Sequence, residues 1–318
     1  MKENFYILGN GNLKAEEGVF RFDSRDGMRR IPVENIRSLN IYGGCNVSSG
    51  AINLSKKYNV ILNFFGYYGN YIGSFWPTEM YFSGDLTVQQ VKLFLDGKKR
   101  LELCNTLVDG IKYNMEHFLS GYDIETDIMN LPIQGDSIEH LMLSEARIRK
   151  QYYKYLDILL PDQFKLEARV KHPPNNFGNT LISFGNSRLY SELITQSRYV
   201  SLNPTISFYH SPESSRYSLP LDISEVFKPY LVDKFILKIL KKGIIKTDDF
   251  FKEGNGILLN KNGRMKFLQE WERWLNESYF YNKLKRNVSN RELLKIELYK
   301  LIKHYMEIEN YHYFMPGR

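Results

Sequence analysis

Cysteine and long apolar runs are scarce in this sequence, and each scarcity excludes a class of protein. The two cysteines, Cys45 and Cys104, form neither a CxxC pair nor a disulfide framework, which favours a reducing cytoplasm with both thiols in the interior. No apolar run approaches the roughly 20 residues of a membrane span. The opening stretch, MKENFYILGNG, lacks the apolar core of a signal peptide. We therefore expect a cytoplasmic protein with no membrane partner.

The short motifs of common enzyme classes are also missing. The sequence contains no GxxxxGK[ST], no HExxH and no GxSxG. The GNGN of residues 9–12 is not GxGxxG, and no helical pattern follows it. The sequence therefore contains no nucleotide or cofactor motif that would support a helical metal-binding enzyme acting on small molecules.

Apolar content and positive charge are what the sequence does have. Of its 318 residues, 43% are hydrophobic and 14% aromatic, which is enough for a sizeable core, and the length favours two domains over one. Lys and Arg number 43 against 36 Asp and Glu, a formal net charge of +7. This excess favours an anionic partner, with nucleic acid the first candidate, although a mildly basic surface alone also explains it.

The N-terminal part has the pattern of a small β domain with two packed sheets. Short segments rich in β-branched and aromatic residues, separated by turns with Gly and Asn, predict strands at 5–8, 19–22, 36–42 and 60–65. One helix is expected after Ser48 or Ser49, either of which can cap it, and its apolar face begins at Ala51.

From Val88 onward the apolar residues recur with a helical period. The expected helical segments are 88–121, 138–159, 178–199, 223–242, 261–281 and 290–308. The fold class predicted is therefore α+β, with a β-sandwich-like domain carrying one short helix at 1–80 and a mainly α-helical catalytic domain at 86–318. The joint between them is expected near 77–87.

Glu145 is the first candidate for chemistry. It lies in a predicted helix on the same face as apolar residues, which are Ile138, Leu141, Met142, Ile148 and Tyr152. A carboxylate on an apolar stripe is costly unless it is paired or bound to a metal. Glu145 is therefore either part of a functional site or the partner of a cation such as Arg149, one turn further on.

His210, Asp222 and Glu225 form a second candidate group. Asp222 and Glu225 are one helical turn apart and can face the same point, and a Ser/Pro-rich stretch can fold His210 back over that turn. One imidazole with two or three carboxylates suits Mn²⁺ or Mg²⁺, and the nitrogen donor favours Mn²⁺. Because the spacing is no standard metal motif, capping or surface roles for these residues stay open.

Two basic clusters follow this group. The stretch KFILKILKKGIIK covers 234–246, and KLKRNVSNRELLK covers 283–295. Beside a metal site such clusters would bind phosphate, whereas either one taken alone is more typical of a solvated helix face. The candidates for nucleic-acid contact are Lys228, Lys238, Lys241, Lys242, Lys285 and Arg286.

Several longer stretches, taken together, are more specific than any single spacing. One is SEARIRKQYY around Glu145, and another is RVKHPPNNFGNTLISFGNSRLYSEL. A third is LNPTISFYHSPESSRYSLPLDISEVFKPYLVD, which resembles the family pattern D-P-x-x-G-F-x-H, S-L, D-x-x-E and R-P-x-x-V-D. With RRIPVENIRSLNIYGGCNVSSGAINLSKKYNVILNFFGYYGNYIGSFWP nearer the start, they make the chain resemble, over nearly its full length, the CRISPR-associated endonuclease/integrase family, the larger subunit of the spacer-acquisition complex (Cas-one).

The resemblance implies roles for the matching residues. Glu145, His210 and Glu225 would be ligands of Mn²⁺ or Mg²⁺, and Asp222 would be a further catalytic acid that helps hold the metal or orients His210. The chain departs from the family pattern at four positions without losing a ligand. Asn203 replaces Asp, Ser207 replaces Gly, Tyr209 replaces an aliphatic residue and Lys228 replaces Arg.

The resemblance also implies partners and an activity. Family members form homodimers through their β domains, associate with a small ferredoxin-like adaptation subunit (Cas-two) and bind double-stranded DNA, both the prespacer and the CRISPR repeat. The implied reaction inserts prespacer DNA into the CRISPR array through attack of a 3′-hydroxyl on a phosphodiester. A non-catalytic basic DNA-binding scaffold and a related mobile-element transposase are the alternatives.

Overall fold

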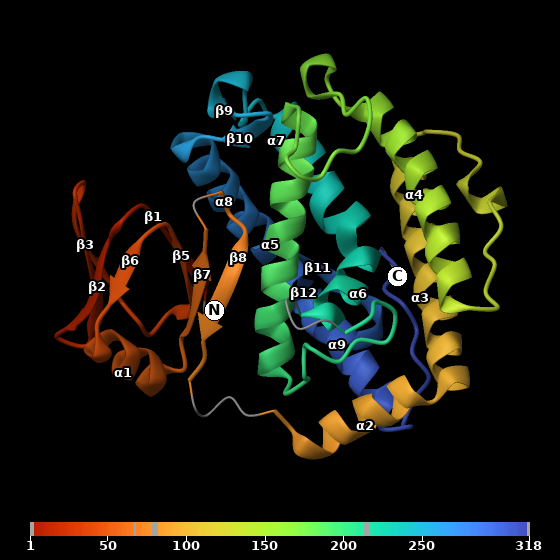
Figure 1. Ribbon diagram of the computed structural model, residues 1–318, viewed down its shortest axis with the longest axis horizontal. Helices are drawn as coiled ribbons and strands as arrows, with labels where there is room; N and C mark the ends of the chain where they lie inside the picture. Colours follow the sequence, from red (N-terminus) through yellow and green to blue (C-terminus); the bar gives the residue numbers. More distant parts are fainter. Residues whose placement is uncertain (1–2, 67, 78–81, 213–216, 317–318) are drawn as a thin grey trace. The chain divides into compact units, whose positions relative to one another are not determined.

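The computed structural model describes residues 3–66, 68–77, 82–212 and 217–316, which belong to two compact units (Figure 1). The first unit comprises 1–81 and 259–272, and the second comprises 82–258 and 273–318. The predicted fold class, a strand-rich N-terminal part followed by a mainly helical part, is confirmed. Each of the expected domains, 1–80 and 86–318, is one continuous stretch of sequence. In the structure, residues 259–272 belong to the first unit.

The first unit contains two four-stranded sheets. One has the order β1-β5-β7-β8, with β1 (Glu3–Leu8), β5 (Ile36–Tyr42), β7 (Ile61–Phe65) and β8 (Tyr71–Phe75). The other has the order β4-β3-β2-β6, with β4 (Gly27–Ile31), β3 (Val19–Ser24), β2 (Gly11–Glu16) and β6 (Cys45–Val47). Strands β1, β5 and β7 are parallel, and β2, β3 and β4 are antiparallel. Leu39 and Leu62 of one sheet share a core with Leu13 and Phe20 of the other, as in a β-sandwich.

The expected helix is present as α1 (Ser49–Tyr58), and Ser48 caps it by accepting a hydrogen bond from the Ala51 amide. Strands β2, β4, β6 and β8 were not expected from the sequence. Strand β4 shows the reason, since four of its five residues are exposed at the edge of a sheet. Such a strand is held by main-chain hydrogen bonds and carries no alternating apolar pattern.

Helix α8 (Lys261–Asn276) explains why a late segment belongs to the first unit. Glu272 accepts hydrogen bonds from the Asn4 amide at 3.1 Å and the Tyr6 hydroxyl at 3.2 Å. At the other end of this segment, Lys261 pairs with Asp26 at 2.6 Å. These contacts join residues more than 200 positions apart, so no local sequence pattern reports them.

The second unit is mainly helical, and α5 (Phe177–Tyr199), most of whose residues are buried, packs against α6 (Ser218–Phe227), α7 (Lys234–Lys241) and α9 (Asn290–Tyr305) (Figure 1). The others are α2 (Gly84–Leu95), α3 (Gly97–Ser120) and α4 (Ile138–Leu159). Helix α3 packs against α4, and α6 packs against α5 and α3. No helix in the described ranges combines the length and apolar character needed to cross a membrane.

Two of the expected helices are interrupted. The segment 88–121 contains α2 and α3, because Asp96 leaves the helical conformation and its side chain caps α3 through the Lys99 amide. The segment 223–242 contains the end of α6, a π-helical stretch at Lys228–Asp233 and α7. Pro229 in that stretch lacks the amide hydrogen of a regular helix. Local backbone chemistry therefore divides what the apolar period predicts as continuous.

The remaining elements are short. Two hairpins are formed by β9 (Phe250–Glu253) with β10 (Gly256–Leu259) and by β11 (Ser278–Tyr281) with β12 (Arg286–Ser289). Single 3₁₀ turns are η1 (Ile128–Asn130), η2 (Asp162–Phe164), η4 (Thr247–Asp249) and η5 (Asn282–Leu284). The expected helix 261–281 thus ends at Asn276, before β11.

Gly178 in the first turn of α5 provides a test of this packing. A Cβ atom there would lie 2.2 Å from the Phe164 carbonyl oxygen, a backbone atom. We expect Gly178→Ala to lower the free energy of unfolding by about 1–3 kcal/mol, measured by urea denaturation. The control is Gly97→Ala at the start of α3, where a Cβ atom would meet nothing within 4 Å and the change should stay below about 0.5 kcal/mol. Equal stability of the two variants would contradict the packing.

Candidate active site

Asp222, on helix α6, organises the segment that carries His210. Its carboxylate is fully buried and accepts hydrogen bonds from the Phe208 and Tyr209 amides at 2.9 and 3.0 Å. It accepts two more from the backbone amide and Nδ1 of His210, at 2.9 and 2.8 Å. The expected return of His210 over the helical turn is therefore present. Residues 213–216 of the intervening Ser/Pro-rich stretch lie outside the described residues.

The contact with Asp222 determines which nitrogen of His210 is available. With Nδ1–H donating to the carboxylate, Nε2 carries the lone pair, which is the state required of a metal ligand. Burial lowers the pKa of His210, but the hydrogen bond and charge of Asp222 outweigh it and the pKa is raised. The carboxylate thus both orients the ring and stabilises positive charge on it.

Glu145 on α4 and Glu225 on α6 are joined by one guanidinium. Nη2 of Arg149 lies 2.5 Å from Oε1 of Glu145 and 2.5 Å from Oε2 of Glu225. The Arg149 side chain is 14% exposed, and those of Glu145 and Glu225 are 13% and 10% exposed. Lys228 donates to the remaining oxygen of Glu225. Two carboxylates from different helices therefore converge on a single point that a cation occupies.

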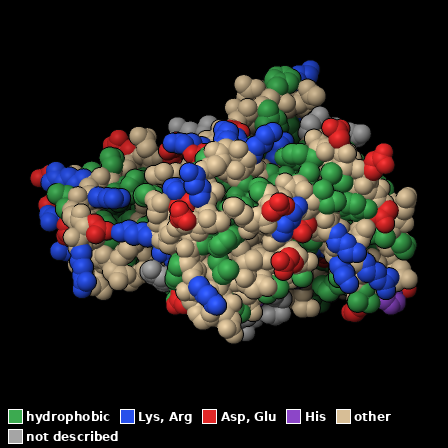
Figure 2. Space-filling view, turned by 90° about the horizontal axis from the view of Figure 1, so that it is seen from above, with side chains coloured by type: hydrophobic (Ala, Val, Ile, Leu, Met, Phe, Trp, Pro, Cys, Tyr) green, Lys and Arg blue, Asp and Glu red, His purple; other side chains and the backbone are tan. Residues whose placement is uncertain are grey.

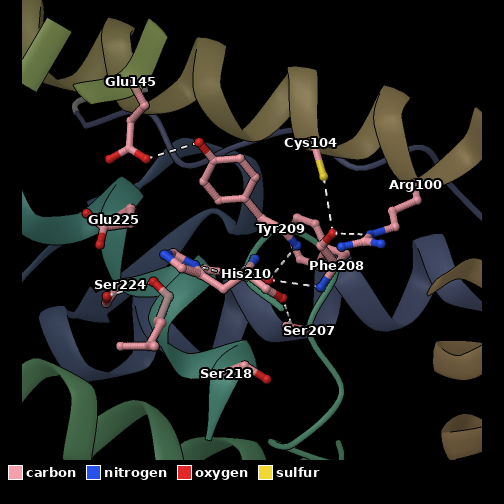
Figure 3. Close-up of polar contacts among 12 residues, drawn as sticks. Arg100, Cys104, Glu145, Ser207, Phe208, Tyr209, His210, Ser218, Ser224 and Glu225 are labelled. Atoms are coloured by element: carbon pink, nitrogen blue, oxygen red, sulfur yellow. Dashed lines mark hydrogen bonds and ion pairs between the residues drawn. The ribbon is translucent and has the colours of Figure 1, made fainter. Parts of the chain in front are cut away.

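Tyr209 occupies the other side of Glu145. Its hydroxyl donates to Oε2 of Glu145 at 3.1 Å (Figure 3), and the tyrosine is fully buried. Burial and the neighbouring carboxylate both raise the pKa of this hydroxyl, which keeps it protonated as a donor. Figure 3 also shows that Glu145, Glu225 and the His210 ring lie at the same end of the segment 207–210. The four predicted catalytic residues are thus in one place.

The charges in this cluster shift one another. Burial raises the pKa of Glu225, but Arg149 and Lys228 outweigh it and lower the pKa to about 2. Burial lowers the pKa of Arg149, yet Glu225 and Glu145 hold it well above its usual value. For Lys228 burial prevails, and the pKa is lowered although Glu225 is its partner. Glu225 and Arg149 are therefore charged at neutral pH.

The donor set fits Mn²⁺ or Mg²⁺, because two carboxylates and one imidazole nitrogen are suitable ligands for these hard cations. Within the described part of the chain, no group of three or more His, Cys, Asp or Glu has an arrangement that could hold a metal ion. Nη2 of Arg149 lies between the carboxylates of Glu145 and Glu225.

The sequence pattern predicted Arg149 only as a possible ion-pair partner of Glu145. That ion pair is present, and the same guanidinium also reaches Glu225, 76 positions further on. The i+4 spacing from Glu145 and the i+3 spacing from Glu225 to Lys228 are the only local signals of this network. The roles of Tyr209 and of the Arg149 bridge were missed because they depend on tertiary packing.

The residues predicted to contact nucleic acid differ in exposure and in their acidic partners. Lys228 is mostly buried against Glu225, Lys238 pairs with Glu277, and the exposed Arg286 pairs with Glu292. Lys241, Lys242 and Lys285 are exposed. On the face shown in Figure 2, Lys and Arg occur in small groups with acidic and apolar side chains among them.

Asp233 lies at the end of the π-helical stretch, where it accepts a hydrogen bond from the Tyr152 hydroxyl at 2.7 Å. Burial raises the pKa of Asp233 to about 6 from a reference of 3.8, against the opposing hydrogen bond. Because the folded state retains this proton to a higher pH than the unfolded chain, stability should fall as pH rises from about 4 to about 6.

Asp233→Asn removes this titration and keeps an oxygen for Tyr152. We expect the stability of the variant relative to the wild type to increase by on the order of 2 kcal/mol between pH 4 and pH 7, measured by urea denaturation at each pH. Parallel pH profiles for the two proteins would show that Asp233 does not titrate in this range.

Asp222→Ala removes the shared acceptor of three backbone amides. We expect hydrogen exchange at residues 208–210 to accelerate by on the order of 100-fold, because unsatisfied buried amides favour local opening. The control is Asp85→Ala, at an exposed position in the first turn of α2, which should leave this exchange unchanged. Unaltered protection in Asp222→Ala would mean that other contacts hold the segment.

The chain is similar to known proteins over nearly its full length. Residues 5–273 match the family model described as CRISPR associated protein Cas1. The CRISPR-associated endonuclease Cas1 of Methanothermobacter thermautotrophicus is 42% identical over 317 residues, which cover 99% of this chain and 95% of that protein. A Cas1 structure from Thermotoga maritima has a TM-score of 0.89 at 30% identity, and the match covers 98% of this chain and 100% of that one.

A further solved structure, a casposase bound to integration product, has a TM-score of 0.88 at 20% identity, covering 100% of this chain and 94% of that one. At that identity the likeness concerns the fold alone. The family model and the full-length relative carry the assignment. This chain belongs to the CRISPR-associated Cas1 family.

Proposed function

We propose that the chain is a divalent-metal-dependent DNA endonuclease and integrase of CRISPR adaptation, which joins prespacer DNA to the CRISPR array. The observation that carries the proposal is the convergence of Glu145 and Glu225 on one cation position beside a histidine oriented by Asp222. The name of the relative from Methanothermobacter thermautotrophicus, an endonuclease, supports the same class of reaction.

The four residues have distinct roles in this proposal. Glu145, His210 and Glu225 are the metal ligands, with Mn²⁺ favoured over Mg²⁺ by the imidazole nitrogen. Asp222 is a positioning residue, because all of its hydrogen bonds hold the segment 208–210 and the His210 ring. Tyr209 orients the Glu145 carboxylate through its hydroxyl. The ligands thus come from three separate segments that the fold brings together.

The proposed reaction is a transesterification. The 3′-hydroxyl oxygen of the incoming strand forms a bond to phosphorus at the repeat edge, and the phosphorus bond to the former 3′-oxygen breaks. The attacking hydroxyl loses its proton, and the departing 3′-oxygen gains one. When bound, the divalent cation would lower the pKa of the attacking hydroxyl and neutralise charge on the phosphate. With water as the nucleophile, the same arrangement would cut DNA.

The cationic side chains around the carboxylates serve the substrate in this scheme. Carboxylates alone repel a phosphodiester, so positive charge must prevail where the substrate binds. Lys228 lies directly beside Glu225, and the exposed Lys241, Lys242 and Lys285 are available for backbone contacts. Together they would bind DNA without regard to its sequence.

The proposed partners follow from the family. They are prespacer and repeat DNA, a second copy of the chain and a small ferredoxin-like adaptation subunit. The β unit is the proposed dimerisation surface, and the exposed edge strand β4 is available there for contact with a second copy. The cytoplasm is the proposed compartment.

Two alternatives make different demands on the site. A basic DNA-binding scaffold needs only the lysine clusters, so it leaves the buried arrangement of Glu145, His210, Asp222 and Glu225 without a purpose. A related mobile-element transposase would use the same four residues but would join DNA without preference for a CRISPR repeat. The fold shared with a casposase keeps this second alternative relevant.

The test is strand joining by the purified protein with its small partner subunit, Mn²⁺ and a 3′-hydroxyl duplex, on a supercoiled plasmid carrying a CRISPR array. We expect Glu145→Ala and His210→Ala each to reduce joining by at least about 100-fold, because each removes a metal ligand. DNA affinity should change by less than about threefold, since both variants retain the proposed phosphate-binding lysines Lys228, Lys241, Lys242 and Lys285.

His140→Ala is the matched control, because His140 is exposed on the same helix as Glu145 and pairs only locally with Asp136. Full joining by His210→Ala would contradict the assignment of His210 as a metal ligand. Joining by the wild type at random plasmid positions would favour the transposase. DNA binding without joining by any variant would favour the scaffold.

A further inference from the structure

Every carboxylate oxygen of Glu145 and Glu225 has a donor within the chain. Oε1 of Glu145 accepts from Nε and Nη2 of Arg149 at 2.9 and 2.5 Å, and Oε2 accepts from Tyr209 at 3.1 Å. In Glu225, Oε2 accepts from Nη2 of Arg149 at 2.5 Å and Oε1 accepts from Lys228. Arg149 makes three of these five hydrogen bonds and is therefore the main partner of the two carboxylates.

Because of the position of Nη2, the two carboxylates cannot bind Arg149 and a metal ion in these positions at the same time. This nitrogen is 2.5 Å from one oxygen of each glutamate, so a divalent cation held by both glutamates would compete with it for the same carboxylates. A metal ion and the guanidinium held side by side there would repel each other with little screening, because the site is mostly buried. Arginine cannot yield by releasing a proton, because its guanidinium stays charged in proteins. Arg149 can therefore leave the carboxylates only if its side chain moves.

Charge balance explains why a cation is needed there when the metal is absent. Glu145, Glu225 and Asp222 place three carboxylates within one cluster, and Arg149 and Lys228 are the cations in contact with the two glutamates. An isolated carboxylate at 10–13% exposure would carry a large desolvation penalty. Arg149 offsets that penalty by pairing with both glutamates, and it links α4 to α6 at this point.

We propose that Arg149 is a built-in counter-cation of the metal site, which bridges Glu145 and Glu225 until it is displaced and thereby sets the affinity of the site for divalent cations. This inference rests on the proposed function, because it takes the two glutamates as metal ligands. Once displaced, the guanidinium remains tethered to α4 beside the site, where a phosphodiester would offer it a bidentate acceptor. DNA and metal should therefore bind cooperatively, with Arg149 exchanging carboxylates for phosphate.

The experiment is a titration of the purified, metal-free protein with Mn²⁺ in the absence of DNA, with free Mn²⁺ measured by electron paramagnetic resonance. We expect Arg149→Met to bind Mn²⁺ at least about tenfold more tightly than the wild type, because no cation has to leave the carboxylates. Arg149→Lys should fall between the two, since an ammonium cannot bridge both carboxylates with one planar group. The matched control is Arg147→Met, an exposed position on the same helix, which should leave the affinity unchanged.

Circular dichroism of each variant checks folding, and Arg149→Lys carries the test if Arg149→Met does not fold. Affinity equal to or weaker than that of the wild type in the folded variants would overturn the inference. The second readout is the change in Mn²⁺ affinity when a DNA duplex is added. We expect a larger gain in the wild type than in Arg149→Met, and equal gains would likewise count against the exchange.

A further variant separates this inference from the proposed function. Glu145→Gln should abolish Mn²⁺ binding in both the wild-type and the Arg149→Met backgrounds. If binding is insensitive to Glu145→Gln, the proposed metal site is wrong. If binding depends on Glu145 but Arg149→Met does not tighten it, the site stands and only the counter-cation role fails. If the wild type binds no Mn²⁺ without DNA, Arg149→Met should acquire binding, and its failure to do so overturns the inference.

Discussion

The hydrogen bonding of Asp222 is the constraint on which the rest of the site depends. A fully buried carboxylate has to find donors inside the protein, and Asp222 takes three of them from consecutive backbone amides at 208–210. Those bonds hold the segment against α6, with Nδ1 of His210 on the same carboxylate. They also direct Tyr209 toward Glu145. One side chain thus fixes the orientation of two others.

The site consequently has a rigid half and an exchangeable half. Asp222 is satisfied by backbone amides, which cannot leave without unfolding the segment. Glu145 and Glu225 are satisfied largely by Arg149 and Lys228, whose long side chains can move while their helices stay in place. This division suits a site that must keep its histidine in one orientation while cations and phosphates come and go. Rigid positioning and exchangeable charge are thereby assigned to different carboxylates.

Much of the architecture could be predicted from local pattern. The α-helical period located α3, α4, α5 and α9, and the Ser48 cap located α1, because these features depend on neighbours within one or two turns. The edge strand β4 could not be predicted, since its exposed residues carry no alternation. The return of 259–272 to the first unit depends on bonds such as that between Glu272 and the Asn4 amide, which no window along the chain contains.

The amino-acid sequence by itself determined the family, the α+β class and the candidates Glu145, His210, Asp222 and Glu225, since these rest on residue identity and spacing. It left open whether Glu145 serves chemistry or merely pairs with Arg149. Only the tertiary structure decided that one guanidinium lies between Glu145 and Glu225, which are on separate helices. The physical reason is that competition for a buried lone pair depends on which side chains packing brings within hydrogen-bond distance, and this distance is not encoded in any local period.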